Sequence, residues 1–207
     1  MFSDIQLNEL RNDVKQYMSD HRYMHTLAVE NAAIFLGEML LPARVSDLRV
    51  AALLHDITKE MSYDEQFSLL ASYGFALSEE DRAALPALHS FSAAPFIRLR
   101  FAEYATDDIL SSVFNHTLGT ENITLFDKII FIADFIEDGR TYDTCIATAE
   151  FIRKNIVSEN TFDQNLYFLN KGILMSIDAT ISSVLKKNQI PHSRTLAMKK
   201  QIENQIN

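Results

Sequence analysis

The sequence predicts a single all-α domain, and three observations lead to that fold class. Its 207 residues include only five glycines and four prolines, which are few for a fold of many short strands and tight turns. Residue types that favour helices, such as Leu, Ala, Glu, Lys and Met, dominate the composition. Apolar residues also recur at helical spacing. A chain of this length with 47% hydrophobic residues can fill one core, so we expect one domain over residues 1–207.

Helix starts and helix breaks follow in order along the chain. Three pairs of residues have or resemble the spacing of a capping box: Ser62 with Glu65, Ser78 with Asp81, and Thr124 with Asp127. Residues that interrupt helices separate the expected segments: Gly74, Pro86, Gly119, Gly139 and Pro191. The expected helices are therefore 4–19, 22–40, 46–57, 62–73, 78–85, 89–101, 106–117, 124–137, 143–156, 161–187 and 193–204.

The formal net charge of −9 narrows the classes of partner. An acidic chain lacks the basic face that releases counterions from a nucleic acid backbone, so we expect no nucleic acid partner. A small anionic substrate is still open, because bound metal ions would supply local positive charge. The chain has no run of about 18 apolar residues, so we expect no membrane partner.

The cellular location follows from the cysteine count and the first residues. Cys145 is the only cysteine and cannot form an intramolecular disulfide, which fits a reducing compartment. The opening stretch MFSDIQLNEL is interrupted by Asp4 and Glu9 and does not read as a signal peptide. We therefore expect a cytoplasmic protein.

Ligand-type side chains recur at helix ends or among apolar neighbours. The six of interest are His25, His55, Asp56, His89, His116 and Asp134. Asp134 stands within the apolar run KIIFIADFI, where an aspartate is rarely buried without a partner. A polar group without a bond is costly in such surroundings, and metal coordination would satisfy all six.

Each of these residues alone also has a purely structural interpretation. His25 could be a hydrogen-bonded histidine on a half-buried face, and His55 with Asp56 could simply end a helix. Asp56 would then stand near the negative end of a helix dipole, so positive charge is expected close to it. Separate structural explanations would be needed at five positions, and a metal site explains the pattern better.

Other catalytic patterns do not match. His21 and His25 have the spacing of a helical zinc pair, but Arg22 follows His21 where a metalloprotease would carry glutamate. Cys145 has no histidine close in sequence that would activate it as a nucleophile. The stretch GTENITLFDK contains one glycine, so a phosphate-binding loop of the P-loop type is absent.

The order His, His-Asp, His, His, Asp resembles the HD-domain superfamily of metal-dependent phosphohydrolases, in the subset with extra histidines for a second metal. Five stretches resemble more closely the YqeK family of bacterial symmetrical diadenosine tetraphosphate hydrolases: HRYMHTLAVE at 21–30, AALLHDITKE at 51–60, the His89 segment, FNHTLG at 114–119 and LFDKIIFIADFIEDGR at 125–140. The resemblance implies an HD-domain helical bundle with its motif core at about residues 21–140 and C-terminal helices at 143–204.

The resemblance also implies a cofactor, a reaction and a ligand set. The two metal ions would be divalent, with iron favoured and manganese or zinc allowed, because the ligands are imidazoles and carboxylates without thiolates. The reaction would be cleavage of diadenosine tetraphosphate to two ADP. One ion would be held by His25, His55, Asp56 and Asp134, and the other by Asp56, His89 and His116, so that Asp56 bridges them.

Catalytic and substrate-binding roles extend this ligand set. Asp56 is the expected catalytic bridge, and Lys59 would neutralise charge on the transferred phosphoryl group unless it is a solvated surface lysine. Arg140 would contact phosphate or ribose unless it pairs with Asp138 or Asp143. His21 would orient His25 or meet the nucleotide substrate. His192 and Arg194, in the tail stretch IPHSRT, carry no expected chemistry.

Other functions would require different residues at particular positions of this sequence, or are favoured by one of its residues. The ppGpp hydrolases need a Glu-Asp pair after the motif, but Ile57, Thr58, Lys59 and Glu60 follow Asp56 here, and the Gly-Tyr-Pro loop of cyclic-di-GMP phosphodiesterases is absent. A one-metal HD nucleotidase acting on another nucleotide is the nearest enzymatic rival. A nucleotide-binding regulator without turnover is favoured by Thr120, where the family usually carries arginine. A homodimer is left open.

Overall fold

The computed structural model describes residues 2–206, which form eleven α-helices and no β-strand. The elements in chain order are α1 (Asp4–Val14), η1 (Lys15–Tyr17), α2 (Asp20–Leu40), η2 (Pro42–Arg44), α3 (Val45–Leu54), α4 (Tyr63–Ser72), α5 (Glu79–Ala83), η3 (Leu85–Ala87), α6 (Leu88–Arg100), η4 (Ala102–Tyr104), α7 (Asp107–Asn115), α8 (Leu125–Ile136), α9 (Asp143–Asn155), α10 (Phe162–Lys186) and α11 (Ser193–Ile206). The all-α prediction is confirmed over these residues.

The capping residues begin helices where the sequence predicts. Ser62 accepts a hydrogen bond from the backbone N–H of Glu65, and the Glu65 side chain accepts one from the backbone of Ser62. The same reciprocal pair is present at Ser78, before α5, and at Thr124, before α8. Each box satisfies two N–H groups that have no partner inside the helix, which fixes the start of the helix.

Two expected helices end at least three residues earlier than predicted. The segment 4–19 divides into α1 and η1, because the Ser19 side chain accepts from Arg22 N and starts α2 at Asp20. The segment 46–57 ends as α3 at Leu54, since the next backbone bonds, such as Lys59 N to Asp56 O at 2.9 Å, span three residues rather than four. His55 and Asp56 therefore stand in a turn rather than inside a helix.

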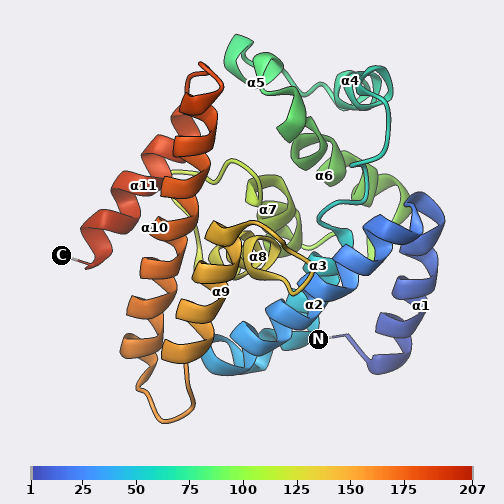
Figure 1. The fold of residues 1–207 in the computed structure, drawn as a ribbon. Helices are drawn as coiled ribbons and strands as arrows, with labels where there is room; N and C mark the ends of the chain where they lie inside the picture. Colours follow the sequence, from blue (N-terminus) through green and yellow to red (C-terminus); the bar gives the residue numbers. More distant parts are fainter. Residues whose placement is uncertain (1, 207) are drawn as a thin grey trace.

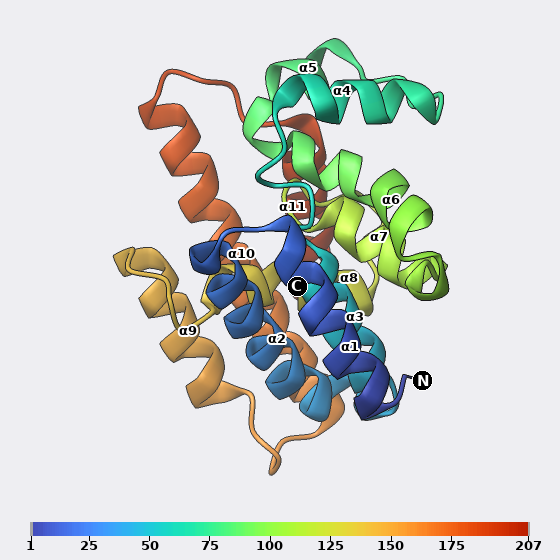
Figure 2. The same ribbon diagram turned by 90° about the vertical axis from the view of Figure 1, so that its right-hand side faces the viewer.

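One large hydrophobic core holds most of the helices together. Figures 1 and 2 show how these helices lie around one another. α2 packs against α3 and α8, while α7 packs against α3, α6 and α8. α8 lies near the middle of the molecule, and Ile129, Ile130 and Ile132 on it are fully buried. α9, α10 and α11 form one side of the molecule, with α10 between the other two (Figure 1). The core therefore brings α2 and α8, which are far apart in sequence, to the same place.

A second, smaller hydrophobic cluster lies where α4 packs on α6. Leu70, Leu88 and Phe91 are its buried members. α4 and α5 lie at one end of the molecule, the upper end in Figure 1, and α5 is the one close to the end of α10. Among residues 2–206, no helix combines the length and apolar character that crossing a bilayer requires.

Candidate metal centre and active site

The six predicted ligand residues meet at one buried site, and Asp56 lies at its centre. The Oδ2 atom of Asp56 is 3.6 Å from His25 Nε2 and 3.5 Å from His55 Nε2. Its Oδ1 atom is 3.1 Å from His89 Nε2 and 3.6 Å from His116 Nε2. Each carboxylate oxygen therefore faces a different pair of histidines, which is the arrangement that a shared ligand requires.

Asp134 completes one side of this site. Its Oδ1 atom is 3.2 Å from His25 Nε2 and 4.0 Å from His55 Nε2. On the other side, the Nε2 atoms of His89 and His116 are 3.1 Å apart. The structure thus brings together all six residues that the sequence singles out, from α2, α6, α8 and the turns after α3 and α7.

The two histidines that follow helices are oriented by the backbone. Nδ1 of His55 is 2.7 Å from the carbonyl oxygen of Ala52, and Nδ1 of His116 is 2.6 Å from that of Val113. A carbonyl oxygen only accepts, so each Nδ1 carries the proton and donates it. The unprotonated Nε2 atoms then point to Asp56, ready to act as ligands.

These side chains fit a divalent metal ion. Within the described residues, Nε2 of His25 and Nε2 of His55 are buried without a hydrogen-bond partner. Ligand atoms of His25, His55 and Asp134 lie within 4.8 Å of one another, as do those of His55, Asp56 and His116. Buried polar atoms without partners are costly, and nitrogen and oxygen ligands of this kind suit iron, manganese or zinc.

Burial and neighbouring charges set the protonation of the site. Burial lowers the pKa of His55 and of His89 to about 4, so both rings are neutral at pH 7. Burial alone would raise the pKa of Asp56, but His55, with His116 and His89, holds it well below its usual range. His55 and His89 are therefore neutral imidazoles beside the ionised carboxylate of Asp56, the protonation states that bind metal.

His25 differs from the other histidines because two carboxylates contact its ring. Burial opposes its charged form, but Asp134 and Glu137 outweigh that effect and raise its pKa to about 9. Nδ1 of His25 is 3.2 Å from Glu137 Oε1. Glu137 is itself buried, with 4% of its surface exposed, so it holds the ring in a fixed orientation.

Three cationic side chains contact residues of the site, two at its carboxylates and one at His89. Nη1 of Arg22 is 2.7 Å from Asp56 Oδ2. Nη2 of Arg140 pairs with Asp134 Oδ1, and its Nε donates to the Asp134 carbonyl oxygen at 2.9 Å. Nζ of Lys59 is 3.1 Å from His89 Nε2. Arg140 thus contacts Asp134 rather than the Asp138 or Asp143 considered from sequence.

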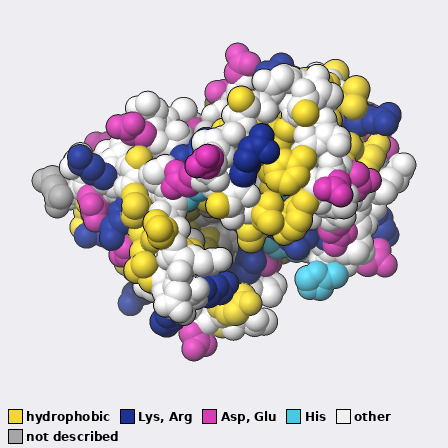
Figure 3. All heavy atoms as spheres, turned by 90° about the horizontal axis from the view of Figure 1, so that it is seen from above, with side chains coloured by type: hydrophobic (Ala, Val, Ile, Leu, Met, Phe, Trp, Pro, Cys, Tyr) yellow, Lys and Arg dark blue, Asp and Glu magenta, His cyan; other side chains and the backbone are white. Residues whose placement is uncertain are grey.

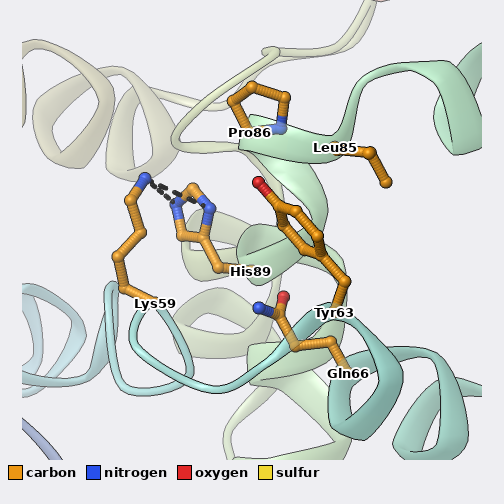
Figure 4. Close-up of a pocket in the computed structure, with 6 residues that line it drawn as sticks. All are labelled: Lys59, Tyr63, Gln66, Leu85, Pro86 and His89. Carbon is orange, nitrogen blue, oxygen red and sulfur yellow. Dashed lines mark hydrogen bonds between the residues drawn. The ribbon is translucent and has the colours of Figure 1, made fainter.

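A pocket of about 200 Å³ opens beside Lys59 and His89 (Figure 4). Figure 4 shows the Lys59 ammonium and the His89 ring pointing toward one another, with Tyr63 and Pro86 across the pocket. Burial lowers the pKa of Lys59. Lys59 is therefore a partly buried side chain at the site and not the fully solvated lysine that was the alternative.

Sequence reasoning missed Arg22 and Glu137. Arg22 stands three residues before His25, and Glu137 three residues after Asp134, so each is one helical turn from a ligand on the same face. That spacing is the only local signal for them. His21, by contrast, is exposed, and Glu137 is the residue that contacts Nδ1 of His25. A contact between His21 and substrate stays a prediction.

The fold and the site define an HD domain. The family model described as "HD domain" matches residues 22–138, and the chain belongs to this family. A solved structure described as a predicted HD superfamily hydrolase involved in NAD metabolism, from Clostridium acetobutylicum, superposes with a TM-score of 0.81 at 26% identity, covering 99% of this chain and 98% of the other.

Within that family, the resemblance to symmetrical diadenosine tetraphosphate hydrolases is confirmed by curated relatives. A symmetrical bis(5'-nucleosyl)-tetraphosphatase of Bacillus subtilis is 30% identical, over 85% of this chain and 86% of its own length. The protein of the same name from Halalkalibacterium halodurans is 31% identical, over 91% of this chain and 92% of its own length.

Proposed function

We propose that this chain is a metal-dependent hydrolase that cleaves diadenosine tetraphosphate symmetrically to two ADP. The observation that carries this function is the match to relatives of that name over 85% and 91% of the chain. The six motif residues meet at one site in the same chain, with Asp56 between two pairs of histidines. A nucleotide is therefore the proposed small-molecule substrate.

Two divalent ions, with iron favoured over manganese or zinc, would be held by residues that already converge. One would be held by His25, His55, Asp56 and Asp134, and the other by Asp56, His89 and His116. Such ions supply an activated water and neutralise charge on a phosphoryl group when bound. The unpartnered Nε2 atoms of His25 and His55 support this assignment.

The cationic side chains would bind the phosphate chain. Lys59 lies beside His89, within reach of a phosphoryl group held at the histidine pair, and would neutralise the charge that develops there. Arg140 and Arg22 already contact the carboxylates of the site, so their remaining N–H groups can turn to phosphate oxygens. The leaving group, a nucleoside diphosphate, needs no strong general acid.

Chromatography of the reaction products tests the register of cleavage. Purified, metal-loaded protein incubated with diadenosine tetraphosphate should release ADP alone. ATP plus AMP would mean that the attacked phosphate is displaced by one position. No cleavage of the dinucleotide, together with rapid hydrolysis of nucleoside monophosphates, would place the protein with the one-metal HD nucleotidases.

A regulator that binds nucleotide without turnover is the second candidate, and Thr120 is the observation that favours it. The family usually carries an arginine at this point of the loop, so one phosphate contact is absent here. Tight binding of the dinucleotide by metal-loaded protein, with no product after prolonged incubation, would support the regulator and exclude the hydrolase.

Three features of the whole protein stay predictions. The chain would act as one domain over residues 1–207, in the cytoplasm, with neither nucleic acid nor membrane as a partner. A homodimer is the proposed alternative to a monomer. Sedimentation of the purified protein distinguishes the two states.

A further inference from the structure

A second and larger cavity, of about 610 Å³, shares Pro86 in its lining with the pocket in Figure 4. α5 and η3 form one wall, and the C-terminal part of α10 with the start of α11 forms the other. Most of the lining is apolar, including Ala83, Leu118, Ile181 and Val184. Seen from above, hydrophobic side chains gather around a hollow in this part of the surface (Figure 3).

This cavity adjoins the candidate metal centre. Thr117, which lines it, has its Oγ1 atom 3.2 Å from Nε2 of His89. Pro86 and Ala87 also line it, and they immediately precede the helix that carries His89. A ligand with one end at His89 can therefore place its other end in the cavity without crossing a helix.

The charges of the lining exclude phosphate as the occupant. No lysine or arginine is among the lining residues, whereas Glu80 is. The cations that suit phosphate, Lys59, Arg22 and Arg140, all contact residues of the metal centre instead. The occupant is consequently a neutral group attached to a phosphate chain that lies elsewhere.

One buried hydrogen-bond donor in the lining indicates that the neutral group in this cavity has a polar edge. His192 lines the cavity, and 7% of its side chain is exposed. Its Nδ1 atom accepts a hydrogen bond from Arg194 N at 3.2 Å, so the neutral ring carries its proton on Nε2. That Nε2 atom is buried and lies 3.2 Å from Asp81 Oδ1 and 4.0 Å from Glu80 Oε2, but it makes no aligned hydrogen bond within the described residues. An acceptor atom on a ligand in the cavity can therefore compete with these carboxylates for its proton.

We propose that this cavity binds one nucleoside of the dinucleoside polyphosphate, with the base against Ile181 and Val184 and an edge atom accepting from His192 Nε2. The volume lies within the roughly 300–1,000 Å³ usual for small-molecule sites, where apolar walls bury a ligand and a few polar groups orient it. This inference rests on the proposed function, since it places a part of the same substrate.

Filling the cavity from either wall tests the assignment. Val184→Trp and Ala83→Trp start from partly or fully exposed positions, so both should fold. Leu185→Trp is the matched control, because Leu185 is exposed on the same helix and does not line the cavity. Isothermal titration of metal-loaded protein with ADP should show affinity reduced about tenfold or more in the first two variants and unchanged in the control.

A nucleoside-free ligand separates the cavity from the phosphate site. Inorganic tripolyphosphate should inhibit wild type and the cavity variants equally, while KM for diadenosine tetraphosphate rises in the variants. His192→Phe keeps an aromatic ring but removes the hydrogen-bond donor. This variant should bind ADP more weakly and bind tripolyphosphate as wild type does. The thermal midpoint of each variant shows whether a loss of ADP affinity is caused by unfolding of the protein.

The outcomes distinguish this inference from the proposed function. Symmetrical hydrolysis with ADP affinity and KM unchanged in both tryptophan variants would overturn the nucleoside cavity and leave the function standing. No hydrolysis of dinucleotides, with ADP binding that the two variants weaken, would overturn the function and leave the cavity standing. Equal weakening of ADP and tripolyphosphate would also overturn the cavity assignment.

Discussion

Asp56 is the residue through which the two halves of the candidate metal centre are joined. Its oxygens face His25 and His55 on one side, and His89 and His116 on the other. The carboxylate is 4% exposed, so water does little to compensate its negative charge. Removing Asp56 therefore acts on both halves at once, whereas removing one histidine acts on a single half.

Replacing Asp56 by alanine should abolish hydrolysis more completely than replacing His89 by alanine. The loss in Asp56→Ala should exceed the roughly 10–100-fold expected for a residue that only orients a ligand. Steady-state hydrolysis of diadenosine tetraphosphate and the metal content of each variant are the measurements. An Asp56→Ala protein that kept most of its activity would rule out a shared ligand.

The contact between Glu137 and His25 leads to a second prediction for a single residue, which concerns metal affinity. Glu137→Gln removes the charge that faces Nδ1 of His25, so the ring becomes a poorer and less fixed ligand. Metal affinity, or activity at limiting metal, should fall roughly 10–100-fold. Titration with Mn²⁺ against a chelator measures this directly. Glu150→Gln, at an exposed position, is the control and should match wild type.

At the scale of elements, α8 carries the site on one face and a buried cation on another. Asp134 faces the histidines, while Lys128 lies under α10 and α11, with 4% of its surface exposed. Its Nζ donates to Asn170 Oδ1 at 2.8 Å and to Gln205 Oε1 at 2.6 Å. Both partners are neutral amides, so burial lowers the pKa of Lys128 to about 8.

Stability should therefore depend on pH through Lys128. Because its pKa falls from 10.5 unfolded to about 8 folded, the unfolded chain binds more protons between these values. The unfolding free energy attributable to this group then rises by roughly 2–3 kcal/mol as pH increases from 8 to 10.5, and the penalty is fully present below pH 8.

Urea unfolding at several pH values measures this contribution as a difference from a variant. Lys128→Met loses the titrating group, so the rise with pH should be smaller in the variant by that amount. The variant also loses the hydrogen bond to Asn170. The effect of that loss on the unfolding free energy does not change with pH in this range, so it shifts the whole curve. Parallel curves for variant and wild type would contradict a depressed pKa at Lys128.

At the scale of the whole molecule, the single core assembles the site. The ligands span residues 25 to 134 and stand on α2, α6, α8 and the turns after α3 and α7, which pack against one another through the core. An unfolded chain does not hold these side chains together. Metal ions therefore bind the folded state selectively and should stabilise it.

Removing metal should lower the thermal midpoint. At free metal of about 100 times Kd, one bound ion adds about 2.7 kcal/mol of stability, and a chelator removes it. Elemental analysis of untreated protein should show up to two ions per chain, mostly iron. Asp56→Ala should respond little to the chelator. One ion at full occupancy, with His89 and His116 uninvolved, would contradict the two-metal centre.

Much of this protein could be predicted from local patterns. Ser62, Ser78 and Thr124 cap helices because a cap is a contact between residues three apart, and such contacts are readable in sequence. The six ligand-type residues could be selected because a buried histidine or aspartate among apolar neighbours needs a partner. The family resemblance is confirmed, while the roles of the six residues stay predictions.

Other features depend on packing between distant segments. Glu137 reaches His25 across 112 residues of sequence, and only the contact of α2 with α8 makes them neighbours. His192 carried no expected chemistry, yet the packing of α11 against α10 places it in the lining of the same cavity as Thr117. Residue type and spacing determine helices and candidate ligands because both act over a few residues. The partners of those ligands, and the cavities between helices, are decided by the tertiary fold, because they depend on how helices remote in sequence lie together in space.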